Sequence, residues 1–189
     1  MPRDNCYIAL LHYPVYNKKG IIVTTAVTNM DIHDISRAAR TYGVKRFYII
    51  TPFEEQKRFV ERILRHWQKG YGASYNPLRK QALDITDVKN TLDDAVADIA
   101  NETGGAKVNL VITGASVKGT FTKYAELKHA IAESNEAYLL LFGTGWGIAR
   151  DVVTTADVVL EPIHGLSDYN HLSVRSAVSI ILDRLFGKR

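Results

Sequence analysis

Side chains that could move a proton are concentrated near the end of the chain. The stretch EPIHGLSDYNH places His164, Asp168 and His171 within eight positions, directly before an apolar segment with helical spacing. Imidazole and carboxylate groups are the usual general acids and bases of enzymes. Asn170 is also a good candidate for a helix N-cap, and the helix dipole alone favours an aspartate there. The run therefore predicts either proton transfer or cap and turn chemistry.

Two turns that contain glycine follow apolar runs. LLLFGTGWGI and VITGASVKG each continue an apolar stretch into glycines at which a ligand could be held, namely Gly114, Gly143, Gly145 and Gly147. Glycine lets backbone N–H groups approach a ligand closely. Neighbouring parallel strands present their carboxyl ends on one edge of a sheet, where ligands of open α/β folds bind. We therefore expect the two turns to share a cleft.

The glycine spacing also allows an NAD-binding oxidoreductase as an alternative. The dinucleotide fingerprint G-x-G-x-x-G is matched poorly, because Ile148 stands where the third glycine should be. Glu161 stands near the position of a ribose-binding acid, which keeps this alternative open.

A basic stripe and an uneven charge distribution point to a polyanionic partner. Residues 1–80 contain 14 Lys and Arg against 6 Asp and Glu, whereas residues 81–189 contain 10 against 14. In the expected helix over 54–70, apolar residues share one face, and the opposite face carries Arg58, Arg62, Arg65 and Lys69. Such a stripe suits a phosphate backbone, and an ordinary solvated helix face is the alternative.

Apolar runs alternate with helical patterns along the whole chain. Strands are expected over 6–12, 45–52, 107–115, 136–143 and 155–163, and helices over 30–43, 54–70, 87–105, 123–134 and 171–186. Residues 71–82 are expected to form a loop. This alternation predicts one α/β domain over 1–189, with a mainly parallel sheet of five to six strands and helices on both faces.

Composition excludes several other classes of protein. The single cysteine, Cys6, rules out an intramolecular disulfide and a multi-cysteine zinc site, and we find no cluster of metal ligands. No apolar run approaches the ~20 residues of a membrane span. The N-terminus lacks the pattern of a signal peptide, so a cytoplasmic protein is expected.

In order along the chain, three segments resemble motifs of the α/β-knot (SPOUT) RNA methyltransferases. DIHDISRAARTYGV is similar to their first motif, LLLFGTGWGI to their glycine loop, and VLEPIHGLSDYNHLSVRSAVSIIL to their final motif. The resemblance spans nearly the whole chain. Its nearest branch is a small bacterial domain that depends on S-adenosylmethionine (SAM), sometimes joined to tRNA (guanine-N1)-methyltransferase.

The resemblance implies a C-terminal trefoil knot, SAM as the cofactor, tRNA or rRNA as the substrate and a homodimer that shares its sites. Arg37 matches the arginine that serves catalysis in members that methylate the ribose 2′-oxygen. By position, the cofactor would be held at Thr113, Gly114, Gly143, Thr144, Gly145, Gly147, Ile163, His164, Gly165 and Leu172.

Three departures from the family pattern leave the acceptor atom open. The glutamate typical of the glycine loop is missing, and Asp31 stands where many members carry asparagine. In the final motif, NHLSV stands where the family has Ser-Leu-Asn-Val-Ser. The acceptor is therefore either a ribose 2′-oxygen or a base nitrogen, with Asp168, His164 and His171 as candidate proton acceptors. A non-catalytic knot protein that binds RNA is a further alternative.

Overall fold

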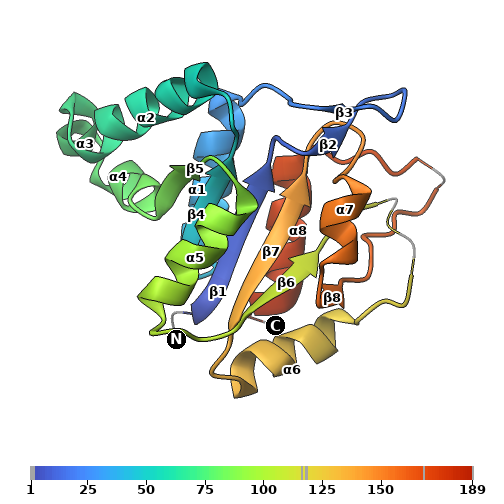
Figure 1. Ribbon diagram of the computed structural model, residues 1–189. Coiled ribbons are helices and arrows are strands. Elements are labelled where there is room, and N and C mark those ends of the chain that lie inside the picture. Colours follow the sequence, from blue (N-terminus) through green and yellow to red (C-terminus); the bar gives the residue numbers. More distant parts are fainter. Residues whose placement is uncertain (1–2, 116, 118, 168, 189) are drawn as a thin grey trace.

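The central feature of the molecule is a parallel sheet of six strands (Figure 1). The computed structural model describes residues 3–115, 117, 119–167 and 169–188. The strands are, in spatial order, β5 (Thr86–Lys89), β4 (Val44–Ile50), β1 (Arg3–Leu11), β7 (Ala137–Gly143), β6 (Val108–Ile112) and β8 (Val158–Val159). Every neighbouring pair runs parallel, which confirms the predicted fold class.

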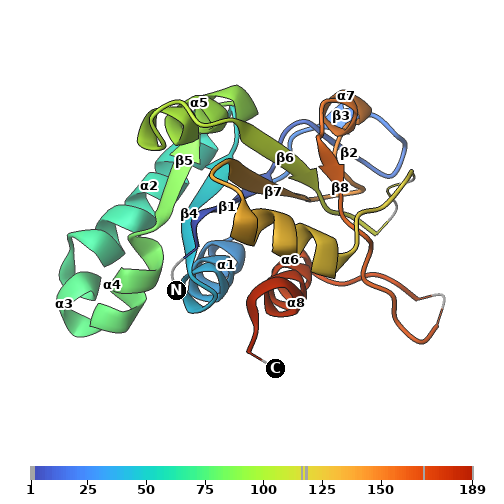
Figure 2. The same ribbon diagram turned by 90° about the horizontal axis from the view of Figure 1, so that it is seen from below.

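Helices cover both faces of this sheet (Figure 2). One face is covered by α1 (Asn29–Thr41), α6 (Tyr124–Glu133) and α8 (Val174–Phe186), and the other by α5 (Leu92–Glu102) and α7 (Arg150–Thr154). The remaining helices, α2 (Glu54–Gln68), α3 (Tyr71–Tyr75) and α4 (Pro77–Leu83), form a lobe at the β5 edge. Among the described residues, no helix is long and apolar enough to cross a membrane.

The central strands are apolar without alternation because each face of the sheet has its own core. In β7, Leu140 and Phe142 pack into the core on the side of α1 and α8, while Leu139 and Leu141 pack into the core under α5 and α7. Successive side chains of a strand point to opposite faces, so a strand covered on both sides must be apolar at every position.

Two expectations for residues 71–105 are wrong. Residues 71–82 are not a loop, because α3 and α4 occupy them; the Asn76 side chain caps α4 by accepting from the Arg79 N–H at 3.0 Å. Residues 87–89 belong to β5 rather than to the next helix. That helix, α5, begins only at Leu92, where Thr91 and Asp94 form a capping box.

The arm between β1 and α1 crosses the carboxyl edge of the sheet. It contains a small antiparallel pair, β2 (Val15–Tyr16) and β3 (Ile22–Val23). The Tyr16 N–H donates to the Gly147 oxygen at 2.9 Å, and the Trp146 N–H donates to the Tyr16 oxygen at 2.8 Å. The arm therefore fastens the glycine loop that follows β7.

Candidate active site

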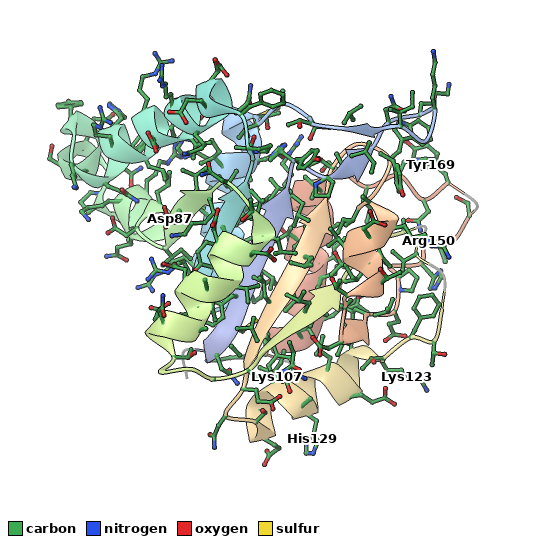
Figure 3. All side chains as sticks on the ribbon, in the orientation of Figure 1. Asp87, Lys107, Lys123, His129, Arg150 and Tyr169 are labelled. Carbon is green, nitrogen blue, oxygen red and sulfur yellow. The ribbon has the colours of Figure 1, made fainter. Side chains whose placement is uncertain are left out.

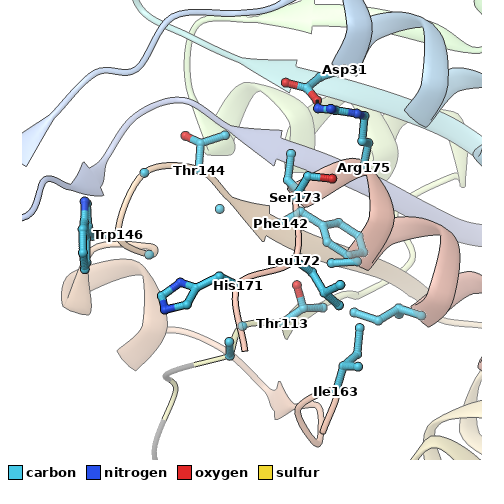
Figure 4. A pocket seen from close by; sticks show the side chains of 18 of the residues that line it. Asp31, Thr113, Phe142, Thr144, Trp146, Ile163, His171, Leu172, Ser173 and Arg175 are labelled. Carbon is cyan, nitrogen blue, oxygen red and sulfur yellow. Dashed lines mark hydrogen bonds and ion pairs between the residues drawn. The ribbon is translucent and has the colours of Figure 1, made fainter. Parts of the chain in front are cut away.

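A cavity of about 720 Å³ opens at the carboxyl edge of the sheet, beside the starts of α1 and α8 (Figure 4). This volume lies within the range of small-molecule sites. Four segments contribute to its wall: the arm before α1, the turn after β6, the glycine loop after β7 and the segment that leads into α8. The lining includes His12, Thr25, Asp31, Thr113, Gly114, Phe142, Gly143, Thr144, Gly145, Trp146, Gly147, Glu161, Ile163, Asn170, His171, Leu172 and Arg175.

The glycine loop needs its glycines for two separate reasons. Gly145 and Gly147 have φ angles of 59° and 112°, in a region that side chains disfavour. A Cβ on Gly145 would also lie 2.8 Å from the Tyr16 oxygen, and one on Gly143 would lie 2.6 Å from Ile148 Cγ1. The arm and the loop are thus in direct contact at Gly145, where a side chain would push them apart, whereas a side chain at Gly143 would displace Ile148 within the loop itself.

A chain of hydroxyl groups links the glycine loop to a buried histidine. Thr144 Oγ1 donates to the Leu11 oxygen at 3.0 Å, so the Thr25 hydroxyl must donate to Thr144 Oγ1. Thr25 Oγ1 therefore accepts from His12 Nδ1, 3.0 Å away. This order of donors assigns the His12 proton to Nδ1 and leaves a lone pair on Nε2.

His12 is held neutral in this position. Its side chain is buried, and burial lowers its pKa from 6.5 to about 4, although the nearby Asp31 carboxylate opposes the shift. His12 Nε2 has no hydrogen-bond partner among the described groups. The same holds for Thr51 Oγ1, which directly follows the neighbouring strand β4. Sequence reasoning did not single out His12, because it reads as the last residue of an apolar strand.

An ion pair joins the starts of α1 and α8 at the wall of the cavity. Arg175 Nη1 donates to Asp31 Oδ1 at 3.2 Å, and Thr28 Oγ1 donates to Asp31 Oδ2 at 2.6 Å (Figure 4). Arg175 Nε also lies 3.8 Å from Asp34 Oδ2. Among the described lining residues, Arg175 is the one lysine or arginine. Sequence reasoning missed it, although a cation in the first turn of a helix opposes the dipole and could have drawn attention.

Comparison with known proteins identifies the family. A family profile described as SAM-dependent RNA methyltransferase matches residues 5–187. The chain belongs to this family. It is an RNA methyltransferase that uses SAM. The family match favours this function over an NAD-dependent oxidoreductase and over a non-catalytic RNA-binding protein.

Related sequences agree with the family assignment. An uncharacterized protein of Aquifex aeolicus is 42% identical over 188 residues, which cover 100% of this chain and 91% of that protein. A tRNA (guanine-N(1)-)-methyltransferase of Oleidesulfovibrio alaskensis is 43% identical over 186 residues, which cover 98% of this chain. The chain spans only 43% of that longer relative.

Solved structures of low sequence identity share the fold. TrmJ from Z. mobilis aligns with a TM-score of 0.62 at 16% identity, covering 100% of this chain and 70% of that one. The SpoU methyltransferase AviRb from Streptomyces viridochromogenes aligns with a TM-score of 0.60 at 13% identity, covering 97% and 59%. AviRb in complex with AdoMet also aligns, with a TM-score of 0.56 at 15% identity, covering 96% of this chain and 56% of that one.

The residues around the cavity fit the SAM that this RNA methyltransferase family uses. SAM combines an aromatic nucleoside with a charged amino-acid end, so its site needs apolar walls together with polar backbone groups. Phe142, Ile163 and Leu172 supply apolar surface, and the glycine loop exposes backbone without side chains. Thr113 closes the β6 end of the cavity, where its hydroxyl donates to the Leu141 oxygen at 2.8 Å.

Most of the predicted cofactor residues come together around this cavity. The lining contains eight of the ten, namely Thr113, Gly114, Gly143, Thr144, Gly145, Gly147, Ile163 and Leu172. His164 and Gly165 lie on the exposed segment before α8 and are not among the described lining residues. Two further lining residues, His171 and Asn170, come from the same segment.

The candidate catalytic residues are not gathered in the cavity. Arg37 lies on the outer side of α1, with 61% of its side chain exposed and Nη1 3.9 Å from Asp34 Oδ1. Like His164, it is absent from the described lining, and Asp168 lies outside the described residues. The expected N-cap at Asn170 is wrong: Ser173 caps α8, and the Asn170 amide donates to the Ile163 oxygen at 3.0 Å.

The predicted basic stripe is exposed on α2. Arg58, Arg62, Arg65 and Lys69 all face solvent, and Arg58 Nε lies 3.2 Å from Glu54 Oε1. Among the described side chains, no ion pair involves Arg62, Arg65 or Lys69. The described residues also contain no group of three or more metal-binding side chains.

Proposed function

We propose that the cavity at the carboxyl edge of the sheet is the SAM site, and that the methyl group passes to a nucleotide of tRNA or rRNA. The observation that supports this most strongly is the convergence of two separate motifs on one cavity. The turn after β7 and the segment before α8 resemble family motifs, and both line it. When bound there, SAM supplies an electrophilic methyl group for in-line transfer.

The protein contributes mainly by positioning. Backbone groups of the glycine loop hold the cofactor, and Phe142 and Leu172 exclude water from it. The Asp31–Arg175 pair holds the starts of α1 and α8 together at the same wall. The proton acceptor is proposed to be Asp168 or His164, with His171 a third candidate because it lines the cavity.

We further propose that two copies of the chain form a dimer with a trefoil knot in each subunit. Arg37 supports a shared site, since its guanidinium is exposed and lies outside the cavity of its own chain. In a dimer it would enter the partner's site and stabilise negative charge developing on the acceptor, or orient a phosphate. Cytoplasmic location remains part of the proposal.

Calorimetric titration tests the cofactor site directly. We expect saturable binding of SAM and of its demethylated product, S-adenosylhomocysteine, and no heat on addition of NAD. Binding of NAD alone would contradict the proposed site.

A further inference from the structure

The lobe formed by α2, α3 and α4 carries a group of exposed apolar side chains that the methyl-transfer site does not use. Tyr71, Tyr75 and Leu78 are 73%, 72% and 77% exposed. The two tyrosine rings are stacked, with centroids 5.7 Å apart and an interplanar angle of 24°. Two parallel aromatic faces that are open to solvent form a surface on which a planar group can stack. We call these three residues the tyrosine platform.

The platform lies in the most basic part of the chain. Residues 57–80 contain seven lysines and arginines, and Glu61 is the single acidic residue among them. Lys69 lies two positions before Tyr71, and Arg62 and Arg65 lie on the preceding turns of α2. An aromatic surface beside unpaired cations is complementary to a planar base attached to a phosphate.

Trp67 packs against the helix that carries the two tyrosines of the platform. Trp67 makes edge contacts with His33 and His66, at centroid distances of 5.5 and 5.0 Å, and Arg79 lies 5.0 Å from its ring. Gly72 is buried against this ring, since a Cβ there would lie 2.7 Å from Trp67 Cε3. The short helix α3 therefore packs on Trp67 in the absence of a ligand, and such pre-organisation lowers the entropy lost on binding.

We propose that the tyrosine platform stacks unpaired bases of the RNA substrate, while Arg62, Arg65 and Lys69 contact the adjoining phosphates. The inference rests on the RNA methyltransferase function and adds the kind of RNA. An A-form duplex keeps its bases stacked inside and offers only its edges and backbone, whereas a loop or bulge exposes base faces. The substrate must therefore present single-stranded nucleotides to the lobe.

Binding of two RNAs by fluorescence anisotropy tests the proposal. One probe is a stem-loop, and the other is the same strand annealed to its full complement. The wild-type protein should prefer the stem-loop. The double variant Tyr71→Ala/Tyr75→Ala should bind it about 10- to 100-fold more weakly, because one stacked base contributes that much. The matched variant Tyr71→Phe/Tyr75→Phe keeps both rings and should retain wild-type affinity.

The proposal would be overturned by equal affinity for duplex and stem-loop, by unchanged binding of the alanine variant, or by equal weakening in the phenylalanine variant. A change in the sedimentation of the alanine variant would also overturn it, in favour of a contact between two copies of the chain. SAM affinity, measured on each variant, should be unchanged. If the wild-type protein transfers no methyl group but still prefers the stem-loop to the duplex, the proposed function is contradicted and the proposal for the tyrosine platform is supported.

Discussion

Arg175 on α8 donates to Asp31 on α1 across the wall of the cavity, with 3.2 Å between Nη1 and Oδ1. The two residues are 144 positions apart in the sequence, and they come from the first and last motifs that resemble the SPOUT family. The pair therefore links the first and the last of these motifs at the wall of the cavity.

Breaking this pair should destabilise the fold. Asp31 is 9% exposed and Arg175 34%, so the interaction is screened only in part. We expect Arg175→Met to lower the free energy of unfolding by about 1–2 kcal/mol, an intermediate value between a surface pair and a buried one. In an Asp31→Asn background the same change should have a clearly smaller effect. Urea denaturation of the four proteins measures the coupling, and additive effects would show that the pair does not act as a unit.

Gly145→Ala should weaken SAM binding by at least about tenfold. The new side chain meets both a φ of 59° and the Tyr16 oxygen at 2.8 Å, so the loop must move away from the arm. Gly104→Ala is the matched control, because Gly104 has a φ of 68° and nothing within 4 Å of its Cβ position. The control should lose about 1 kcal/mol of stability and no SAM affinity, as measured by chemical denaturation and calorimetry. If Gly145→Ala and Gly104→Ala lost SAM affinity equally, the glycine loop would not be part of the SAM site.

His12 should make the protein less stable in mild acid. Its pKa is about 4 in the folded state and 6.5 when unfolded, so the unfolded chain takes up the proton first as the pH falls. The contribution of neutral His12 to the free energy of unfolding is fully present above pH 6.5 and is lost as the pH falls towards 4. Between pH 7 and pH 5 the loss should be about 2 kcal/mol. His12→Asn retains a donor towards Thr25 and does not titrate, so urea midpoints should fall less with pH in this variant. An identical pH dependence would mean that His12 is not held neutral.

The basic stripe should determine how RNA binding depends on salt. Replacing Arg62 and Arg65 together with Gln should reduce the slope of log K against log salt by about 0.7 for each cation removed. Arg58→Gln should change the slope less, because Glu54 already pairs with Arg58. Lys128→Gln is the control: its helix α6, which carries the labelled His129, lies on the other side of the molecule from α2 (Figure 3). Slopes unchanged by the arginine variants would mean that the stripe does not contact RNA.

A mixing experiment tests whether Arg37 acts in its own site or in that of a partner. At a SAM concentration well below the dissociation constant of the Gly145→Ala variant, Arg37→Ala and Gly145→Ala should each be nearly inactive alone. If Arg37 reaches the partner's cavity, a mixed dimer contains one site with both residues intact. Subunit exchange at equal amounts should then restore about a quarter of wild-type activity. If the mixture is no more active than the separate variants, Arg37 either acts in the cavity of its own subunit or has no role in catalysis.

The layered α/β fold and most of the residues that line the cavity could be predicted because their signals are local. Runs such as YLLLF in β7 are apolar at every position, and the glycines of 143–147 follow directly. Parallel strands place these ends on one edge, so the loops at 113–114 and 143–147 could be assigned to one cavity.

The missed features depend on contacts between residues distant in the sequence. The helix α3 has only five residues and is too short to be stable alone, but it packs through Gly72 on Trp67. Within the described part of the chain, the strand β5 pairs with β4 alone, at the edge of the sheet. Neither the approach of Arg175 to Asp31 nor the burial of His12 beside Thr25 leaves a pattern in the neighbouring residues.

Transfer of a labelled methyl group from SAM to RNA tests the central claim most directly. The substrate is total RNA from cells that lack the gene, and total RNA from wild-type cells is the control. We expect the wild-type protein to label RNA from the deletion strain in an amount that saturates, to leave wild-type RNA nearly unlabelled, and to lose this activity on Gly145→Ala. If the protein binds SAM but labels neither RNA, the claim that this cavity methylates RNA is contradicted.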